Sequence, residues 1–197
     1  MLDIETITDK VLPVFDTHKD EENIEIELRL GKYNGSFFDT NVGKETFERV
    51  LDGLRRYTGW ENVKTSVSDI FYSDKDGVRI TSDHETGEQT MIQKINVIKD
   101  DFTGTPLDMR FSISREIPTW GEYEMDRKRT KTRHSFIRKN LSIDMTISSG
   151  DNVDMDSEEE CSYQIEFEII KPGDVSCRDE LFNIIHKVND LSKLIPM

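Results

Sequence analysis

Two strand-like segments near opposite ends of the chain share one pattern, and they constrain the fold more than any other feature. Residues 24–30 read IEIELRL and residues 163–170 read YQIEFEII. Every second residue is apolar and the residues between are mostly glutamate, so each strand would have an apolar face and an acidic face. Carboxylates on alternate residues lie about 7 Å apart and repel by roughly 2 kcal/mol at an effective dielectric near 20. An enclosed acidic face therefore needs cations opposite it.

The segment RKRTKTRHSF at 127–136 supplies such a basic row. One face of this predicted strand carries Arg127, Arg129, Lys131, Arg133 and Ser135. About eight period-2 segments are expected to be strands, at residues 23–31, 67–73, 78–82, 89–99, 108–117, 122–138, 141–148 and 162–170. The residues DKDG at 74–77 are expected to form a hairpin turn between two of them.

Three segments have helical periodicity instead. Apolar stripes recur in residues 1–15, 44–58 and about 177–194, and Ser176 and Asp179 have the spacing of a capping box for the third helix. These stripes need an apolar surface, and the apolar strand faces provide one. We therefore predict an α+β fold: a closed eight-stranded antiparallel β-barrel with a charged lumen, flanked by a few helices. A flat sheet with one wet face, whose charges serve only solubility, is the alternative that periodicity leaves open.

Composition narrows the classes of function. The 197 residues suit one domain, and 40 acidic against 26 basic residues give a net charge of −14, which disfavours a broad surface for nucleic acid or anionic membrane. No zinc-site spacing, secretory signal or bilayer-spanning apolar run is present, so we expect a soluble, intracellular protein. The acidic run at 151–160 lacks the glycine and ligand spacing of an EF-hand, so it is expected to be a mobile loop rather than a calcium site.

Carboxylates from two strands that face a basic row suit a divalent cation together with a polyphosphate. Glutamate oxygens are good ligands for Mg²⁺ or Mn²⁺, which keep waters and contact substrate phosphates. Arginine and lysine bind the phosphate oxygens. The combination fits phosphoryl transfer to water, and the sequence contains no P-loop, dinucleotide-binding, zinc-protease or serine-hydrolase motif.

The order of these segments resembles the triphosphate tunnel metalloenzymes, specifically the fungal and viral type of mRNA-capping RNA 5′-triphosphatase. The resemblance rests on the two E-x-E strands, on KTRHSF at 131–136 and on IDMT at 143–146, and it spans about residues 20–172. Within the family the chain looks similar to the triphosphatase domain at the N-terminus of the capping enzyme of mimivirus-type giant viruses. This implies that residues 1–197 are a single tunnel domain of a longer capping enzyme. Guanylyltransferase and methyltransferase domains would be fused to it or associated with it, in the cytoplasmic viral factory, the nucleus or the virion.

The resemblance also implies an activity. A metal-dependent hydrolysis, with Mg²⁺ or Mn²⁺ as cofactor, would remove the γ-phosphate from triphosphate-ended nascent mRNA and leave a diphosphate end, the first step of capping. Free NTP is a further substrate on this interpretation. Three alternatives share the barrel: a small-molecule tri- or polyphosphatase, a cyclase-like tunnel enzyme, and a non-catalytic barrel that binds polyphosphate.

Carried over residue by residue, the resemblance implies a set of site residues. The expected metal ligands are Glu25, Glu27 and Glu168. The expected catalytic residues are Glu166 beside the attacking water, then Arg79, Lys94, Glu116, Lys131, Arg133, Asp144 and Thr146. The expected phosphate-binding residues are Arg79, Lys94, Lys131 and Arg133, with Arg127 and Arg129 extending the basic row. Two positions depart from the family pattern, Gln164 where a third glutamate can stand and Ser142 where an arginine can stand.

Overall fold

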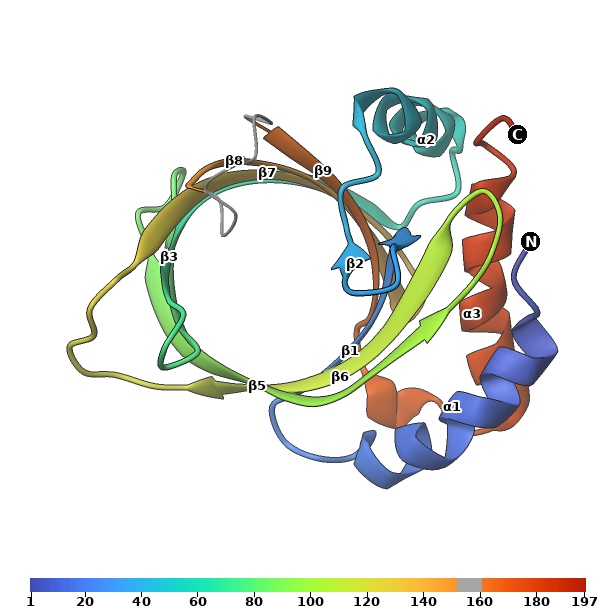
Figure 1. Ribbon diagram of the computed structural model, residues 1–197, viewed down its shortest axis with the longest axis horizontal. Helices are drawn as coiled ribbons and strands as arrows, with labels where there is room; N and C mark the ends of the chain where they lie inside the picture. The colour runs from blue at the N-terminus through green and yellow to red at the C-terminus, as the bar shows by residue number, and fades with distance from the viewer. Residues whose placement is uncertain (152–160) are drawn as a thin grey trace.

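The sheet closes on itself. The structure is a computed structural model that describes residues 1–151 and 161–197, so the predicted acidic loop, apart from Asp151, lies outside the described residues. The described strands form an antiparallel sheet in the order β2-β1-β6-β5-β4-β3-β7-β8-β9, and β1 also pairs with β9. That last pairing makes an eight-stranded barrel, which Figure 1 shows almost end-on. The predicted closed barrel is confirmed, and the flat sheet is wrong.

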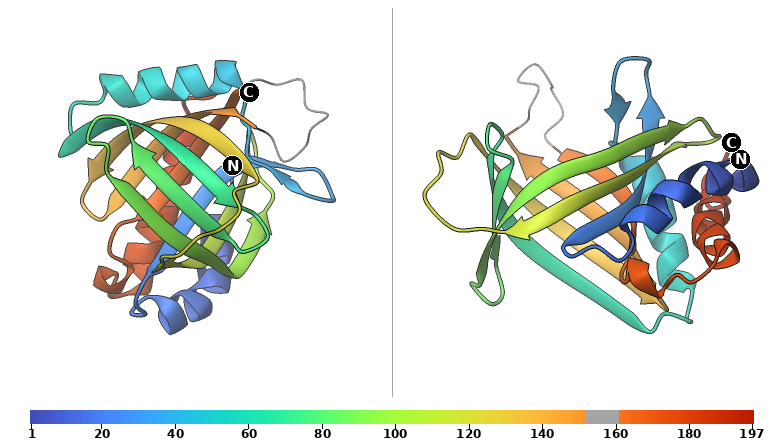
Figure 2. Two further views of the ribbon diagram at one scale, coloured as in Figure 1. Left: turned by 90° about the vertical axis from the view of Figure 1, so that its left-hand side faces the viewer. Right: turned by 90° about the horizontal axis from the view of Figure 1, so that it is seen from below.

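The strand boundaries differ from the prediction mainly at three places, and the first is residues 62–66, which are strand but were not predicted as strand. The observed strands are β1 (Ile24–Tyr33), β2 (Phe38–Asp39), β3 (Asn62–Ser73), β4 (Val78–Asp83), β5 (Gln89–Phe102), β6 (Asp108–Pro118), β7 (Arg127–Arg138), β8 (Leu141–Gly150) and β9 (Cys161–Ile169). Residues 122–126, predicted as strand, belong to the connection from β6 to β7, because three other strands separate these two in the sheet. The short β2 was not predicted. It pairs with the end of β1 in a hairpin that projects from the barrel (Figure 2).

Three helices cover one side of the barrel (Figure 1). They are α1 (Ile4–His18), α2 (Lys44–Arg56) and α3 (Arg178–Ser192), with a short 3-10 turn, η1 (Pro172–Asp174), before α3. The predicted partner of Ser176 was wrong: its backbone N–H and hydroxyl donate to Glu180 at 2.8 and 3.0 Å, and not to Asp179. Among the described residues, no helix has the length and apolar character needed to cross a membrane.

The hydrophobic core lies outside the barrel wall, between the strands and the helices. Ile26 and Leu28 of β1 and Phe167 of β9 are fully buried, and they meet Phe15 of α1 and Ile185 of α3 in one apolar cluster. Each such side chain contributes about 1.5–3 kcal/mol when it is buried. Since neighbours along a strand point to opposite faces, this packing turns the glutamates of β1 and β9 into the lumen.

Candidate active site

Four glutamates of β1 and β9 gather in the lumen. Glu27 lies directly opposite Glu168 in the sheet, and Glu166 lies opposite Arg29. Glu27 and Glu166 are 7% and 6% exposed. The structure therefore brings Glu27, Glu166 and Glu168 together as the sequence predicted, and Glu25 follows one lumen position earlier on β1.

Arg29 neutralises the two most buried of these carboxylates. Its Nε donates to Glu27 Oε1 at 2.8 Å, and its Nη2 lies 2.9 Å from Glu166 Oε1. Burial and the neighbouring carboxylates raise the pKa of Glu27, whereas Arg29 and Arg133 outweigh burial and lower the pKa of Glu166. No role was predicted for Arg29, although the alternation in IEIELRL placed it on this face.

Lys94 of β5 reaches across to the same group of carboxylates. Its Nζ lies 2.5 Å from Glu25 Oε1, 3.9 Å from Glu27 and 4.0 Å from Glu116, whose side chain is 30% exposed. The lysine that was predicted to contact phosphate is therefore held by carboxylates in this structure.

Glu168 is the carboxylate with the least compensation. Within residues 1–151 and 161–197 it has no hydrogen bond and no ion pair, and its nearest charged neighbours include Asp144 and Glu25. Burial, together with repulsion from those two carboxylates, raises its pKa to about 7. This part of the lumen thus carries more negative charge than its own cations neutralise.

Next to β9 lies β8, which carries Asp144 and Thr146 on its lumen face, and beyond it lies β7, which is basic. Arg133 lies 3.8 Å from Glu166 and 4.0 Å from Asp144, and its Nε donates to Thr146 at 3.2 Å. Burial lowers the pKa of Lys131, which has no carboxylate partner among the described residues. These predicted residues of β7 are therefore separated from the glutamates of β9 by β8 alone, and Arg133 reaches over it to Glu166.

The other arginines of the basic row make different contacts. Arg127 forms two bonds with Asp74 at 2.9 and 3.1 Å, at the end of the cavity. Arg129 is 7% exposed and donates to the Ser148 hydroxyl and to backbone carbonyls of residues 148, 150 and 151. These bonds fix the end of β8, so Arg129 has a structural place in addition to its position on the lumen face.

Tyr72 at the end of β3 is a lumen residue that the sequence analysis missed. Three cations surround its ring: Arg127 at 3.9 Å, Arg79 at 5.3 Å and Lys131 at 5.9 Å from the centroid. Burial alone would raise the pKa of Tyr72, but Lys131 and Arg79 outweigh it and lower the pKa. The ring thus gathers three of the predicted phosphate-binding residues. An aromatic residue that ends a strand gives no sequence signal for such a role.

The two departures from the family pattern have local partners. Ser142 donates its hydroxyl to Asp144 at 2.8 Å, and Gln164 donates its amide to the Thr40 hydroxyl at 3.2 Å. Ser142 therefore supports a lumen carboxylate, and Gln164 ties β9 to the segment that follows β2.

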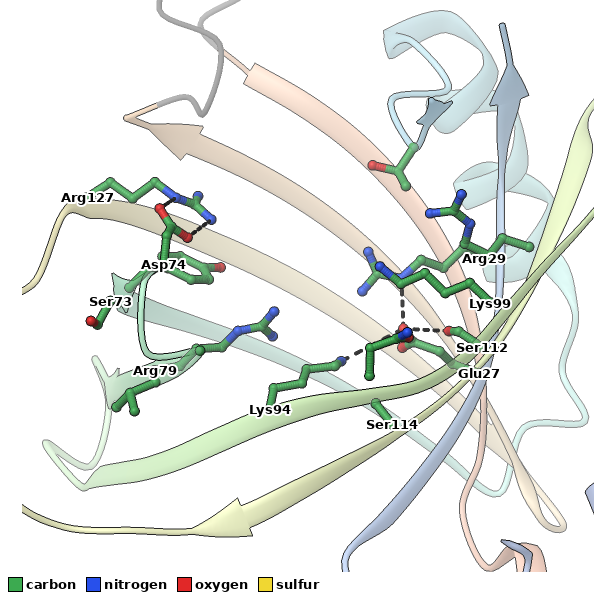
Figure 3. A pocket seen from close by; sticks show the side chains of 16 residues that line it. Glu27, Arg29, Ser73, Asp74, Arg79, Lys94, Lys99, Ser112, Ser114 and Arg127 are labelled. Carbon is green, nitrogen blue, oxygen red and sulfur yellow. Dashed lines mark hydrogen bonds and ion pairs between the residues drawn. The ribbon is translucent and has the colours of Figure 1, made fainter. Parts of the chain in front are cut away.

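A cavity of about 260 Å³ opens from this site (Figure 3). Six cations and two carboxylates line it, the cations being Arg29, Arg79, Lys94, Lys99, Arg110 and Arg127. In a protein with a net charge of −14, this concentration of positive charge favours an anionic ligand.

The lumen fits a divalent cation by its chemistry. In the described ranges no three carboxylate, imidazole or thiol groups already converge on one point. Carboxylate oxygens with uncompensated negative charge are nevertheless present. Glu168, whose pKa is raised, lies near Asp144 and opposite Glu27 in the sheet. Hard carboxylate oxygens of this kind suit Mg²⁺ or Mn²⁺.

A closed eight-stranded antiparallel tunnel, with glutamates on β1 and β9 and with arginine and lysine on β7, defines the class of triphosphate tunnel proteins. The mRNA triphosphatase family, described as mRNA capping enzyme, beta chain, matches residues 46–195. The chain therefore belongs to that family. No curated protein matches it in sequence.

Solved structures agree with the fold. The structure of the S. pombe Pct1 RNA triphosphatase is similar to this chain with a TM-score of 0.78 at 17% identity, over 98% of this chain and 93% of that one. A second structure, of Pct1 in complex with the Spt5 CTD, gives the same TM-score and identity over 100% and 95%. At this level of identity the likeness shows the tunnel fold.

Proposed function

We propose that this protein is a metal-dependent RNA 5′-triphosphatase. The reaction would break the bond between the β- and γ-phosphates of triphosphate-ended RNA, releasing orthophosphate and leaving a diphosphate end. One observation carries the proposal: inside a closed tunnel, the glutamates of β1 and β9 lie beside the basic residues of β7, next to a cavity lined by further cations. Membership in the mRNA triphosphatase family supports it.

The carboxylate wall is assigned to the divalent cation and to water. Glu25, Glu27 and Glu168 would hold Mg²⁺ or Mn²⁺, which supplies charge neutralisation at the phosphates when bound. Glu166, whose pKa is lowered by Arg29 and Arg133, stays ionised and accepts a hydrogen bond from the attacking water.

The basic wall is assigned to the phosphates. Arg79, Lys131 and Arg133 would bind the phosphate oxygens, because Arg79 and Lys131 have no carboxylate partner in the described chain and Arg133 has only distant ones. Lys94 is paired with Glu25 in this structure, and it would also bind a phosphate oxygen once Glu25 binds the divalent cation instead. Asp144 and Thr146 position Arg133, and Glu116 lies 4.0 Å from Lys94 at the rim. Catalysis of this kind depends mainly on positioning and charge neutralisation.

The experiment is release of orthophosphate from triphosphate-ended RNA in Mg²⁺ or Mn²⁺. Glu25→Ala and Glu168→Ala are each expected to lower the rate by about 1000-fold, since a bound cation contributes several kcal/mol to the transition state. A chelator is expected to abolish the activity of the wild type. The matched control is Glu48→Ala on the exposed surface of α2, which should keep full activity. Full turnover by both lumen variants, with an unchanged circular dichroism spectrum, would refute the assignment.

The proposal extends to related substrates and to context. Free NTP carries the same triphosphate and is expected to be hydrolysed as well. We further propose that residues 1–197 act as the tunnel domain of a longer capping enzyme of the giant-virus type, with guanylyltransferase and methyltransferase domains fused or associated. Competition between RNA, NTP and inorganic tripolyphosphate ranks the substrates. Tight binding of tripolyphosphate without hydrolysis in Mn²⁺ would instead favour a non-catalytic barrel.

Tyr72 gives a prediction for the pH profile. Lys131 must be protonated to bind phosphate; burial lowers its pKa, and the hydrogen bond with Tyr72 acts against that lowering. Tyr72→Phe removes the bond, so the pKa of Lys131 should fall further. The alkaline limb of kcat/KM is therefore expected to move to lower pH, while the rate near pH 6 changes less than about threefold.

A second substitution separates the ring from the hydroxyl. Tyr72→Leu also removes the cation–π contacts with Arg79 and Arg127, each worth about 0.5–2 kcal/mol. We expect KM to rise about tenfold in this variant at all pH values. An alkaline limb that stays unchanged in Tyr72→Phe would show that the hydroxyl does not act on Lys131.

A further inference from the structure

A β-bulge in β5 turns one additional lysine into the lumen. Lys94 pairs with Glu116 and Asn96 pairs with Ser114, but the register then slips by one residue, so that Lys99 pairs with Ser112. Strict alternation from Lys94 would point Lys99 to the outside of the barrel. The extra residue reverses this, since bulges re-aim the side chains that follow them. Val97 and Ile98 both pack against the hydrophobic core as a result.

Lys99 lies among other cations. It lines the cavity together with Arg29, Lys94 and Arg110 (Figure 3), and within residues 1–151 and 161–197 no carboxylate forms an ion pair with it. Arg110 is already bound by Asp101 at 2.7 and 2.9 Å. Burial and repulsion from Arg110 and Arg29 lower the pKa of Lys99. The Lys99 side chain is still exposed in part and has no ion-pair partner within the described residues, so its ammonium group is available to an anion.

The two ends of the tunnel differ in charge. Arg29 near the end of β1 lies directly opposite Arg110 near the start of β6, so both mark the same end of the barrel. Towards the other end, β1 carries Glu25 and β6 carries Glu116. Arg29 and Arg110 are paired with carboxylates, so Lys99, which has no ion pair within the described residues, is the cation that the first end offers to a polyanion. We call the end that carries Arg29, Lys99 and Arg110 the basic mouth.

We propose that the RNA chain enters the tunnel through the basic mouth, and that Lys99 binds a backbone phosphate of the RNA beyond its 5′-triphosphate. This inference rests on the proposed function and deepens it. The cations of β4 and β7, Arg79, Lys131 and Arg133, are left for the triphosphate itself. Lys99 is thereby a residue that favours a polynucleotide over a free nucleotide.

The test compares two lysines at opposite ends of the lumen. Lys64 of β3 is exposed. It pairs with Ser135 of β7, which in turn pairs with the lumen residue Asp144 of β8, so Lys64 is on the lumen face at the acidic end and is the matched control. Affinity for a 5′-triphosphate RNA of about 20 nucleotides is measured by fluorescence anisotropy, and KM is measured for that RNA and for inorganic tripolyphosphate. Lys99→Glu is expected to weaken RNA binding at least about tenfold, because one charged hydrogen bond is lost, and to change the KM for tripolyphosphate less than threefold. Lys64→Glu is expected to change neither value by more than threefold.

A second variant guards against misfolding and gives an independent measurement. Lys99→Ala should reduce the slope of log affinity against log salt for RNA by about 0.7, the value for one phosphate contact on a single strand. The inference is overturned if Lys99→Glu weakens RNA and tripolyphosphate equally, if only Lys64→Glu weakens RNA, or if the wild type does not bind RNA. A wild type that binds RNA but releases no orthophosphate would refute the proposed function instead, and the binding comparison would still decide the role of Lys99.

Discussion

Replacing Arg29 by methionine is expected to lower the free energy of unfolding by about 3–5 kcal/mol in buffer without divalent cations. The guanidinium bonds Glu27 at 2.8 Å and Glu166 at 2.9 Å, and both carboxylates are more than 90% buried. Methionine has a similar length but no charge, so two buried carboxylates would lose their main partner. Urea denaturation at pH 7.5 measures the effect.

Two further measurements test whether charge is the cause. The deficit of Arg29→Met should shrink as the pH falls towards 5, because the unpaired carboxylates then have raised pKa values in the folded state and take up protons. Adding Glu166→Gln to Arg29→Met should restore part of the stability at pH 7.5. The control is Arg115→Met, which breaks a partly exposed pair with Glu21 and should cost only about 0–1 kcal/mol. A loss for Arg29→Met no larger than this control would contradict the argument.

The barrel and its carboxylate wall could be predicted because burial fixes the faces of β1 and β9. Leu28 and Phe167 belong to the core, so the alternation forces Glu27 and Glu166 to the other side. Closure of the sheet could be predicted from the charges. An acidic row or a basic row that was enclosed by itself would be destabilised by repulsion, whereas the two rows neutralise each other inside a closed barrel. The ion pair of Arg29 on β1 with Glu166 on β9, across the pairing that closes the sheet, is one outcome.

Lys99 and the contacts of Tyr72 could not be predicted, for different physical reasons. The register slip at Val97 has no signature in a run such as INVIKDD, and alternation alone puts Lys99 on the outer face. Tyr72 meets Arg127 because β3 and β7 are neighbours in the sheet and these two residues pair directly, which is a contact between segments far apart in the sequence. The pairing of Lys94 with Glu25 was equally hidden, because it joins strands that are not neighbours in the sheet.

Replacing Glu168 by glutamine is expected to stabilise the metal-free protein while it lowers the activity at least about 100-fold. The pKa of Glu168 is raised to about 7 from the ordinary 4.5, so the folded state prefers the protonated form. The stability that this preference gives is fully present below pH 4.5 and is lost as the pH rises to about 7. Above pH 7 the ionised carboxylate lowers the free energy of unfolding, and the neutral glutamine removes this destabilisation. The gain should reach about 1–3 kcal/mol at pH 8 and vanish near pH 4.5, since each pKa unit corresponds to about 1.4 kcal/mol.

The response to Mn²⁺ should then separate the two proteins. Wild type is expected to gain thermal stability on addition of Mn²⁺ at pH 8, because the excess carboxylate charge around Glu168 and Glu27 is neutralised by binding. Glu168→Gln should gain much less and should release orthophosphate at least about 100-fold more slowly. Glu48→Gln on α2 is the control, with wild-type behaviour in both measurements. A variant at Glu168 that is less stable than wild type at pH 8, or one that Mn²⁺ stabilises equally, would mean that the carboxylate serves the fold and not the cation.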